Sequence, residues 1–125
     1  MSVKELNESN FASVLTDDNI VIIDFWAPWC GPCRQFAPTF EAASEAHPDI
    51  VFAKVNTEEE QGLAASFRIR SIPTLMIFRE KVMLFNQAGA LPASALEDLI
   101  QQVKALDMEK IHADIAAQQA NNTAS

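Results

Sequence analysis

Two cysteines stand three positions apart in the segment WCGPCR, residues 29–34, and the chain has no others. An apolar run that ends at Trp26 precedes them, and a segment with helical periodicity follows. The pair therefore lies where a buried strand gives way to the first turn of a helix. There the helix dipole favours a thiolate on Cys30, and Cys33, one turn later on the same side, is close enough to form a disulfide with it. Pro32 suits a first turn, because its missing amide hydrogen has no partner there. The spacing predicts a local redox site and excludes a disulfide-scaffold fold.

A zinc site and inert burial are the two other uses of such a pair. A structural zinc needs four ligands, and the only histidines, His47 and His112, lie far apart in the sequence. Inert cysteines are uncommon at a strand-to-helix corner. We therefore expect no metal site.

Length and charge narrow the class of protein further. A chain of 125 residues with 49% apolar and 21% charged residues has the composition of one globular domain. Its net charge of -8 argues against nucleic acid as a main ligand, because Lys and Arg bind phosphate. No apolar run approaches about 20 residues, so no membrane span is expected. The first residues lack the basic start and apolar core of a secretory signal. We expect a cytoplasmic protein.

Apolar patterning predicts alternating strands and helices. Strands are expected at residues 20–26, 50–55, 74–78 and 82–87, with a short edge strand at 2–6. Helices are expected at residues 8–15, 31–47, 59–67 and 93–106. The order β-α-β-α-β-α-β-β-α indicates an α/β fold, with a mostly parallel sheet, helices on both faces and an antiparallel hairpin at one edge. The glutamates at 58–60 are expected in the first turn of the third helix.

Asp24 interrupts the apolar strand six residues before Cys30. Burial disfavours the charged form, so the pKa of this carboxyl should be raised. Two roles are open: Asp24 accepts a proton from Cys33, or it is a structural residue bonded to the backbone or to Lys54. Lys54 is the one charged residue inside the next strand, and it either pairs with Asp24 or lies at an end of the sheet.

Two tryptophans and a proline near the motif are singled out by residue type. Trp26 ends the buried strand and is expected in the core, whereas Trp29, in the loop, is expected to be an exposed platform. Pro73 stands just before a central strand, where a missing hydrogen-bond donor is tolerated. An X-Pro bond is the common route to a cis peptide, but the residues alone leave cis or trans open for Ile72-Pro73. Pro38 should kink the helix that follows the cysteines.

These residues together resemble the thioredoxin family over about residues 2–106. The match is most specific at DFWAPWCGPC, residues 24–33, and continues through Pro38, Lys54, residues 72–74 and residues 89–90. The resemblance implies a thioredoxin-like fold, a central mixed β-sheet flanked by helices. It also implies a thiol-disulfide oxidoreductase that reduces protein disulfides by dithiol-disulfide exchange.

The resemblance further implies a role for each matching position. Cys30 would be the exposed nucleophile and Cys33 the resolving thiol. Asp24 would be the buried acid that helps to deprotonate Cys33, with Lys54 beside it. The residues implied to shape the site or to bind substrate are Trp29, Gly31, Pro32, Ile72, a cis Pro73, Gly89 and Ala90. No cofactor would be bound, and electrons would come from NADPH through the flavin of a thioredoxin reductase.

The chain departs from the family pattern at a turn and at its C-terminus. The link at residues 79–81 lacks the usual glycine, so either a residue adopts a strained positive φ or the turn type differs. Residues 107–125 extend beyond the family's usual last helix, which leads us to divide the chain into a thioredoxin domain, 1–106, and an extension.

The extension carries Met108, Ile111 and Ile115 at spacings of three and four, which predicts a helix to about Ala117, followed by a frayed tail. This helix would continue the preceding one or bend near Leu106. Its apolar stripe would pack on the domain or contact a partner or a second copy of a chain expected to be monomeric.

A disulfide oxidase or isomerase, and a binding or chaperone module with an incidental redox pair, are the alternatives to a reductase. Gly31 and Pro32 between the cysteines resemble the reducing members of the family. The absence of a signal peptide argues against an oxidising compartment.

Overall fold

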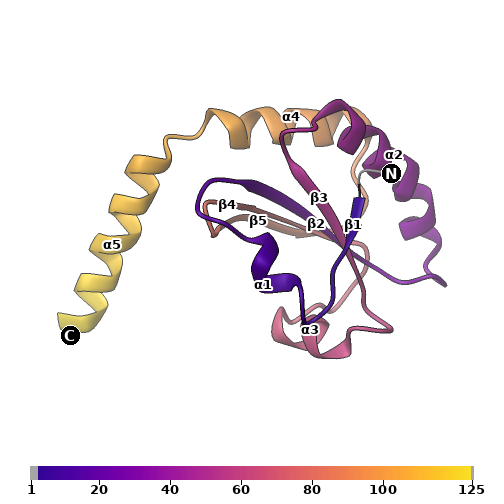
Figure 1. Ribbon diagram of the computed structural model, residues 1–125, viewed down its shortest axis with the longest axis horizontal. Helices are drawn as coiled ribbons and strands as arrows, with labels where there is room; N and C mark the ends of the chain where they lie inside the picture. Colours follow the sequence, from indigo (N-terminus) through magenta and orange to yellow (C-terminus); the bar gives the residue numbers. More distant parts are fainter. Residues whose placement is uncertain (1–2, 125) are drawn as a thin grey trace.

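The computed structural model describes residues 3–124, with side chains as far as Asn121. Within these residues a five-stranded sheet is flanked by helices (Figure 1). The elements in chain order are β1 (Val3–Glu5), α1 (Phe11–Val14), β2 (Ile20–Trp26), α2 (Gly31–Ala46), β3 (Val51–Asn56), α3 (Gln61–Ser66), β4 (Thr74–Arg79), β5 (Val82–Ala88), α4 (Ala93–Ala105) and α5 (Met108–Ala124).

The sheet is mixed, as expected, with strand order β1-β3-β2-β4-β5. The strands β1, β3 and β2 are parallel, β4 is antiparallel to β2, and β5 is antiparallel to β4. The sequence predicted the β4–β5 hairpin but not the reversed direction of β4 against β2. That direction follows from α3, whose six residues span only about 9 Å. The chain therefore turns at the end of the sheet where β3 stops and enters β4 there.

The two faces of the sheet are covered by different helices, because successive side chains of a strand point to opposite faces. Val21, Ile23 and Phe25 pack in a cluster that includes Val14 of α1 and is bordered by Leu63 of α3. The other cluster is formed by Ile50, just before β3, and by side chains of the sheet and of α2 and α4: Ile22, Phe36, Phe40, Phe52, Leu75, Ile77, Leu96, Ile100 and Val103. By this alternation Asp24 and Trp26 share the face of Ile22, against α2.

Two short helices differ from the prediction. The helix expected at 8–15 is only α1, and the three glutamates expected in the first turn of the third helix precede it. Residues 57–59 form a turn and Glu60 is the N-cap of α3. The side chain of Asn56 accepts a hydrogen bond from the backbone N–H of Glu58, so the strand end, rather than the helix dipole, organises these glutamates.

The C-terminal helix is separate from α4, as the expected bend near Leu106 requires. Leu106 has extended backbone angles, with φ of -66° and ψ of 142°. The helix α5 then runs to Ala124, seven residues beyond the end expected from its apolar stripe. Figure 1 shows α5, in yellow, leading away from the sheet. Met108 is buried and Ile111 and Ile115 are half-buried, while the remaining described side chains of α5 are exposed.

Candidate active site

The disulfide Cys30–Cys33 lies at the N-terminus of α2. Cys30 is the N-cap residue, and its Sγ accepts a hydrogen bond from the backbone N–H of Cys33 at 3.2 Å. Pro32 lies in the first turn of the helix. The Cα atoms of the two cysteines are 5.2 Å apart, a normal separation for a disulfide. An amide donor and the positive end of the helix dipole thus both face the Cys30 sulfur.

The expectation that Cys30 is exposed is wrong for the disulfide form. Its relative exposure is 5%, against 2% for Cys33. Both cysteines pack with Ala27 in a small cluster that Trp26 and Ile72 border. The disulfide is therefore covered partly by the loop that contains Ile72, about forty residues later in the chain, and the spacing of the cysteines does not reveal this contact.

The loop that covers the disulfide contains a cis peptide bond between Ile72 and Pro73, as the resemblance implied. The Ile72 carbonyl oxygen lies 3.7 Å from Cys30 Sγ. The backbone N–H of Gly89 donates to the Pro73 carbonyl at 2.8 Å, which places Gly89 and the exposed Ala90 beside this loop. Gly89 has a φ of 108°, a conformation that favours glycine.

The two tryptophans have different surroundings. Trp29 is 66% exposed, which confirms the expected exposure, and its indole N–H donates a hydrogen bond to the Glu58 side chain. Trp26 is half-buried beside the disulfide cluster and lies under the Lys54 ammonium, which is 4.9 Å from the ring centroid. Trp26 is thus part of the site's wall rather than a fully enclosed core residue.

Asp24 lies on β2 opposite Lys54 on β3, and Lys54 lies opposite Glu5 on β1. The three side chains form a row across the α2 face of the sheet. Within the described residues Lys54 pairs with Glu5, at 3.9 Å between Nζ and Oε1, and the Oδ1 atom of Asp24 has no hydrogen-bond partner. Lys54 therefore lies beside Asp24, inside the sheet rather than at its end.

Burial sets the protonation of Asp24, which is 4% exposed. Loss of hydration raises the pKa of this carboxyl from 3.8 to about 7, and the positive charge of Lys54 opposes the rise. The direction agrees with the sequence-based expectation. A carboxyl with a pKa near neutrality can both take and return a proton at physiological pH.

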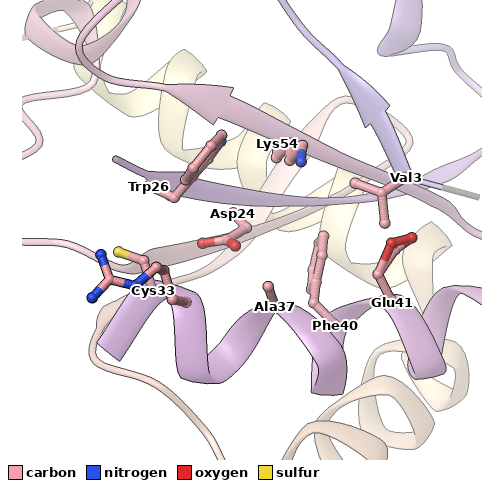
Figure 2. Close-up of a pocket in the computed structure, with 9 residues that line it drawn as sticks. Val3, Asp24, Trp26, Cys33, Ala37, Phe40, Glu41 and Lys54 are labelled. Carbon is pink, nitrogen blue, oxygen red and sulfur yellow. The ribbon is translucent and has the colours of Figure 1, made fainter. Parts of the chain in front are cut away.

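A pocket of about 110 Å³ joins Asp24 to Cys33. Figure 2 shows it between α2 and the sheet, with the Asp24 carboxylate pointing toward the helix that carries Cys33. This volume is large enough to admit water. A proton can therefore pass between Cys33 and Asp24 without direct contact between the two side chains.

Sequence reasoning missed two carboxylates of the site, Glu5 and Glu58. Alternation along the expected edge strand could have placed Glu5 on the same face as Val3, and Val3 packs on the face of the sheet that carries Phe52 and Lys54. No sequence signal links Glu58 to Trp29, 29 residues earlier. In the part of the chain that the structure describes, no group of three or more metal-ligating side chains is found, and no helix is long and apolar enough to cross a membrane.

Comparisons with known proteins agree with this geometry. The thioredoxin family model matches residues 2–121. The chain is 55% identical over 119 residues to a protein of Streptomyces coelicolor described as a thioredoxin 2, covering 95% of this chain and 89% of that one. It is 42% identical over 104 residues to the thioredoxin of the alga Porphyra purpurea, covering 82% and 97%.

A solved structure of a thioredoxin variant from Halobacterium salinarum matches with a TM-score of 0.78 and 31% identity, over 85% of this chain and 94% of that one. The fold, the disulfide at the helix N-terminus and these relatives lead to one conclusion. The chain belongs to the thioredoxin family and is a thiol-disulfide oxidoreductase that reduces protein disulfides through Cys30 and Cys33.

Proposed function

We propose that this protein is a cytoplasmic electron carrier, reduced by NADPH through a thioredoxin reductase, and that it passes electrons to client protein disulfides. The observation that carries the proposal is the disulfide Cys30–Cys33 at the N-terminus of α2, next to a carboxyl whose pKa is raised to about 7. The family of the chain supports this electron source, because thioredoxins are the substrates of such reductases.

In the proposed cycle the Cys30 thiolate attacks one sulfur of the client disulfide. A bond forms between Cys30 and that sulfur, the client bond breaks, and the leaving client thiolate takes a proton. The Cys33 N–H at 3.2 Å and the helix dipole favour a thiolate on Cys30.

The second step releases the client. Asp24 takes the Cys33 proton through the shared pocket, and the Cys33 thiolate attacks Cys30 Sγ. The Cys30–Cys33 disulfide forms as the second client thiolate leaves and is protonated, so the client gains two electrons and the protein loses two. Lys54, opposite Asp24, limits the rise of the Asp24 pKa.

The client would bind on the surface around the disulfide. Trp29 supplies an exposed apolar face, and the Ile72 backbone next to Cys30 Sγ is placed to pair with an extended client strand. Gly89 and Ala90, which are exposed, would complete this surface next to the buried Pro73, while Gly31 and Pro32 would shape the first turn of α2.

A coupled assay tests the electron source. NADPH, a bacterial thioredoxin reductase and insulin are mixed with the protein, and NADPH oxidation is followed by absorbance. We expect oxidation to require the wild-type protein and to be lost in Cys30→Ser. Insulin reduction driven by dithiothreitol, but no NADPH oxidation with several reductases, would contradict the proposed electron source and leave the reductase activity intact.

A further inference from the structure

Three of the chain's four arginines lie in the segments that border the disulfide. Arg34 directly follows Cys33, and Arg68 and Arg70 lie in the loop that leads to Ile72. All three are exposed. Within the described residues none of them forms an ion pair with a carboxylate. The guanidinium of Arg34 donates only to the Pro28 carbonyl, at 2.9 Å.

Four of the other described Lys and Arg side chains form ion pairs with carboxylates. Ion pairs join Lys54 to Glu5, Arg79 to Glu80, Lys81 to Asp17 and Lys104 to Asp49. Within the described residues Lys4 on β1 and Lys110 on α5 also form no ion pair. In a chain with a net charge of -8, three of the five described Lys and Arg side chains without an ion pair therefore lie in the segments that border the disulfide. Arg70 lies close to the site, because it is two residues before Ile72 and the Cα atoms of the two residues are at most about 7 Å apart.

Arg68 stands where a helix usually ends in glycine. It follows the C-cap of α3, has a φ of 55°, and its N–H donates to the Ala65 carbonyl at 3.0 Å, as at many helix ends. Glycine would occupy this conformation without strain. Because the Arg68 side chain has no hydrogen bond or ion pair in the described structure, folding gives no reason for an arginine there.

Negative charge also lies near the site. Glu58 is held at the Trp29 indole and is exposed. The segments around the disulfide thus carry charges of both signs, positive in the loop before Ile72 and negative beside Trp29. Guanidinium groups bind carboxylates in a planar, two-bond geometry, so the positive side suits Asp and Glu.

We propose that Arg68 and Arg70 select client disulfides flanked by acidic residues, by pairing with client carboxylates while the client strand lies along Ile72. This inference rests on the proposed docking of the client at Ile72. It names the class of client: an extended segment with Asp or Glu close to its disulfide.

The test uses two synthetic peptides that each contain one disulfide and differ only in three flanking residues, Asp in one and Lys in the other. The pre-reduced protein is mixed with each peptide at 0.15 M salt, and the rate constant for peptide reduction is measured. We expect the acidic-to-basic rate ratio to fall about fivefold in the double variant Arg68→Gln/Arg70→Gln, because exposed ion pairs have modest strength.

A matched control removes the same charge elsewhere. Lys4 and Lys110 are exposed and lie on β1 and α5, and Lys4→Gln/Lys110→Gln should leave the ratio within 1.5-fold of the wild-type value. Arg68→Lys/Arg70→Lys should restore part of the preference, which a misfolded variant would not do.

Two results would overturn the inference: an unchanged ratio in the arginine double variant, or an equal fall in the lysine control, which would assign the effect to net charge. Failure of the wild-type protein to reduce either peptide would instead contradict the proposed docking and exchange chemistry, so the two failures are distinguishable.

Discussion

The carboxyl group of Asp24 lies between β2 and α2, and its Oδ1 atom has no hydrogen-bond partner among the described residues. The unfolded chain ionises at its ordinary pKa of 3.8, whereas the folded protein holds the proton up to about pH 7. Between pH 3.8 and pH 7 the folded state binds more protons than the unfolded state, so the free energy of unfolding falls as pH rises. Above about pH 7 Asp24 is ionised in both states, and the loss of stability is complete. Three pKa units correspond to about 4 kcal/mol.

Replacing Asp24 with Asn removes this cost. We expect the oxidised variant to unfold with a free energy up to about 4 kcal/mol higher than wild type at pH 8 and to match it near pH 4. Urea unfolding at both pH values measures this. Asp98→Asn, at an exposed position, should show no such difference. A less stable Asp24→Asn at pH 8 would make Asp24 a structural partner of Lys54.

The same variant should slow the release of the client. Without a proton acceptor near Cys33, we expect resolution of the mixed disulfide to be roughly 100-fold slower, within the range for general base catalysis. The step near pH 7 that we expect in the wild-type pH profile of the resolution rate should be absent in the variant. A rapid-quench experiment that follows the mixed disulfide from pH 5 to pH 9 measures both effects. An unchanged profile would show that Asp24 does not take the proton.

Residue type and spacing were enough to predict the disulfide site and the raised pKa of Asp24, because a lone carboxylate in an apolar strand must be desolvated. They were not enough to predict the burial of Cys30. That burial depends on Ile72, whose position over the disulfide follows from long-range folding. For the same reason the bond between Trp29 and Glu58 has no sequence signal.

The turn between β4 and β5 shows how two departures from the family pattern are connected. Glu80 and Lys81 both have positive φ, 53° and 67°, as in a type I′ turn, which is strained for residues with side chains. The Oε1 atom of Glu80 lies 3.0 Å from Nε2 of His112 on α5. Glu80, which occupies a turn position where glycine is usual, therefore connects the turn to α5.

Substitutions by glycine at the two turn positions should have unequal effects. Lys81→Gly relieves strain and loses only an exposed ion pair, so we expect a gain of about 1 kcal/mol. Glu80→Gly relieves similar strain but loses the contacts with His112 and Arg79, so the net gain should be smaller. Thermal unfolding of both variants measures this. An equal gain in both would show that the contact between Glu80 and α5 contributes nothing to stability.

At the level of elements, periodicity predicted the strands and the long helices. It did not predict the end of α5, because residues 118–124 carry no apolar stripe, although they contain no Gly or Pro that would stop a helix. Nor did it reveal that Glu80 meets His112, because that contact depends on the bend at Leu106.

For the whole molecule, we propose that residues 1–106 form the thioredoxin domain and that the first turns of α5 are anchored to it. Truncation after Ala117 should have a much smaller effect on stability than truncation after Leu106, because the described side chains beyond Ala117 are exposed. Truncation after Leu106 should destabilise the protein by about 2 kcal/mol or more, because it removes the buried Met108. Urea unfolding of the two truncated forms tests this, and equal stabilities would show that α5 is not anchored.

Two of the relatives cover different shares of this chain. The Streptomyces coelicolor relative aligns with 95% of this chain, whereas 97% of the Porphyra purpurea thioredoxin aligns with only 82% of it.

We expect the 125-residue chain to be a monomer of 13.8 kDa, measured by light scattering after size exclusion. A mass near twice that value, lost on truncation after Leu106, would make α5 a contact between copies instead.

The central claim is that Cys30 attacks the client and Cys33 resolves the intermediate. The most direct test is to incubate reduced Cys33→Ser and Cys30→Ser with insulin and to identify mixed disulfides by mass spectrometry before and after dithiothreitol. We expect Cys33→Ser to accumulate a mixed disulfide through Cys30, because the Cys30 sulfur accepts the Cys33 N–H at the N-terminus of α2, where a thiolate is favoured. We expect Cys30→Ser to accumulate little. Equal trapping through Cys33 in Cys30→Ser would contradict the account.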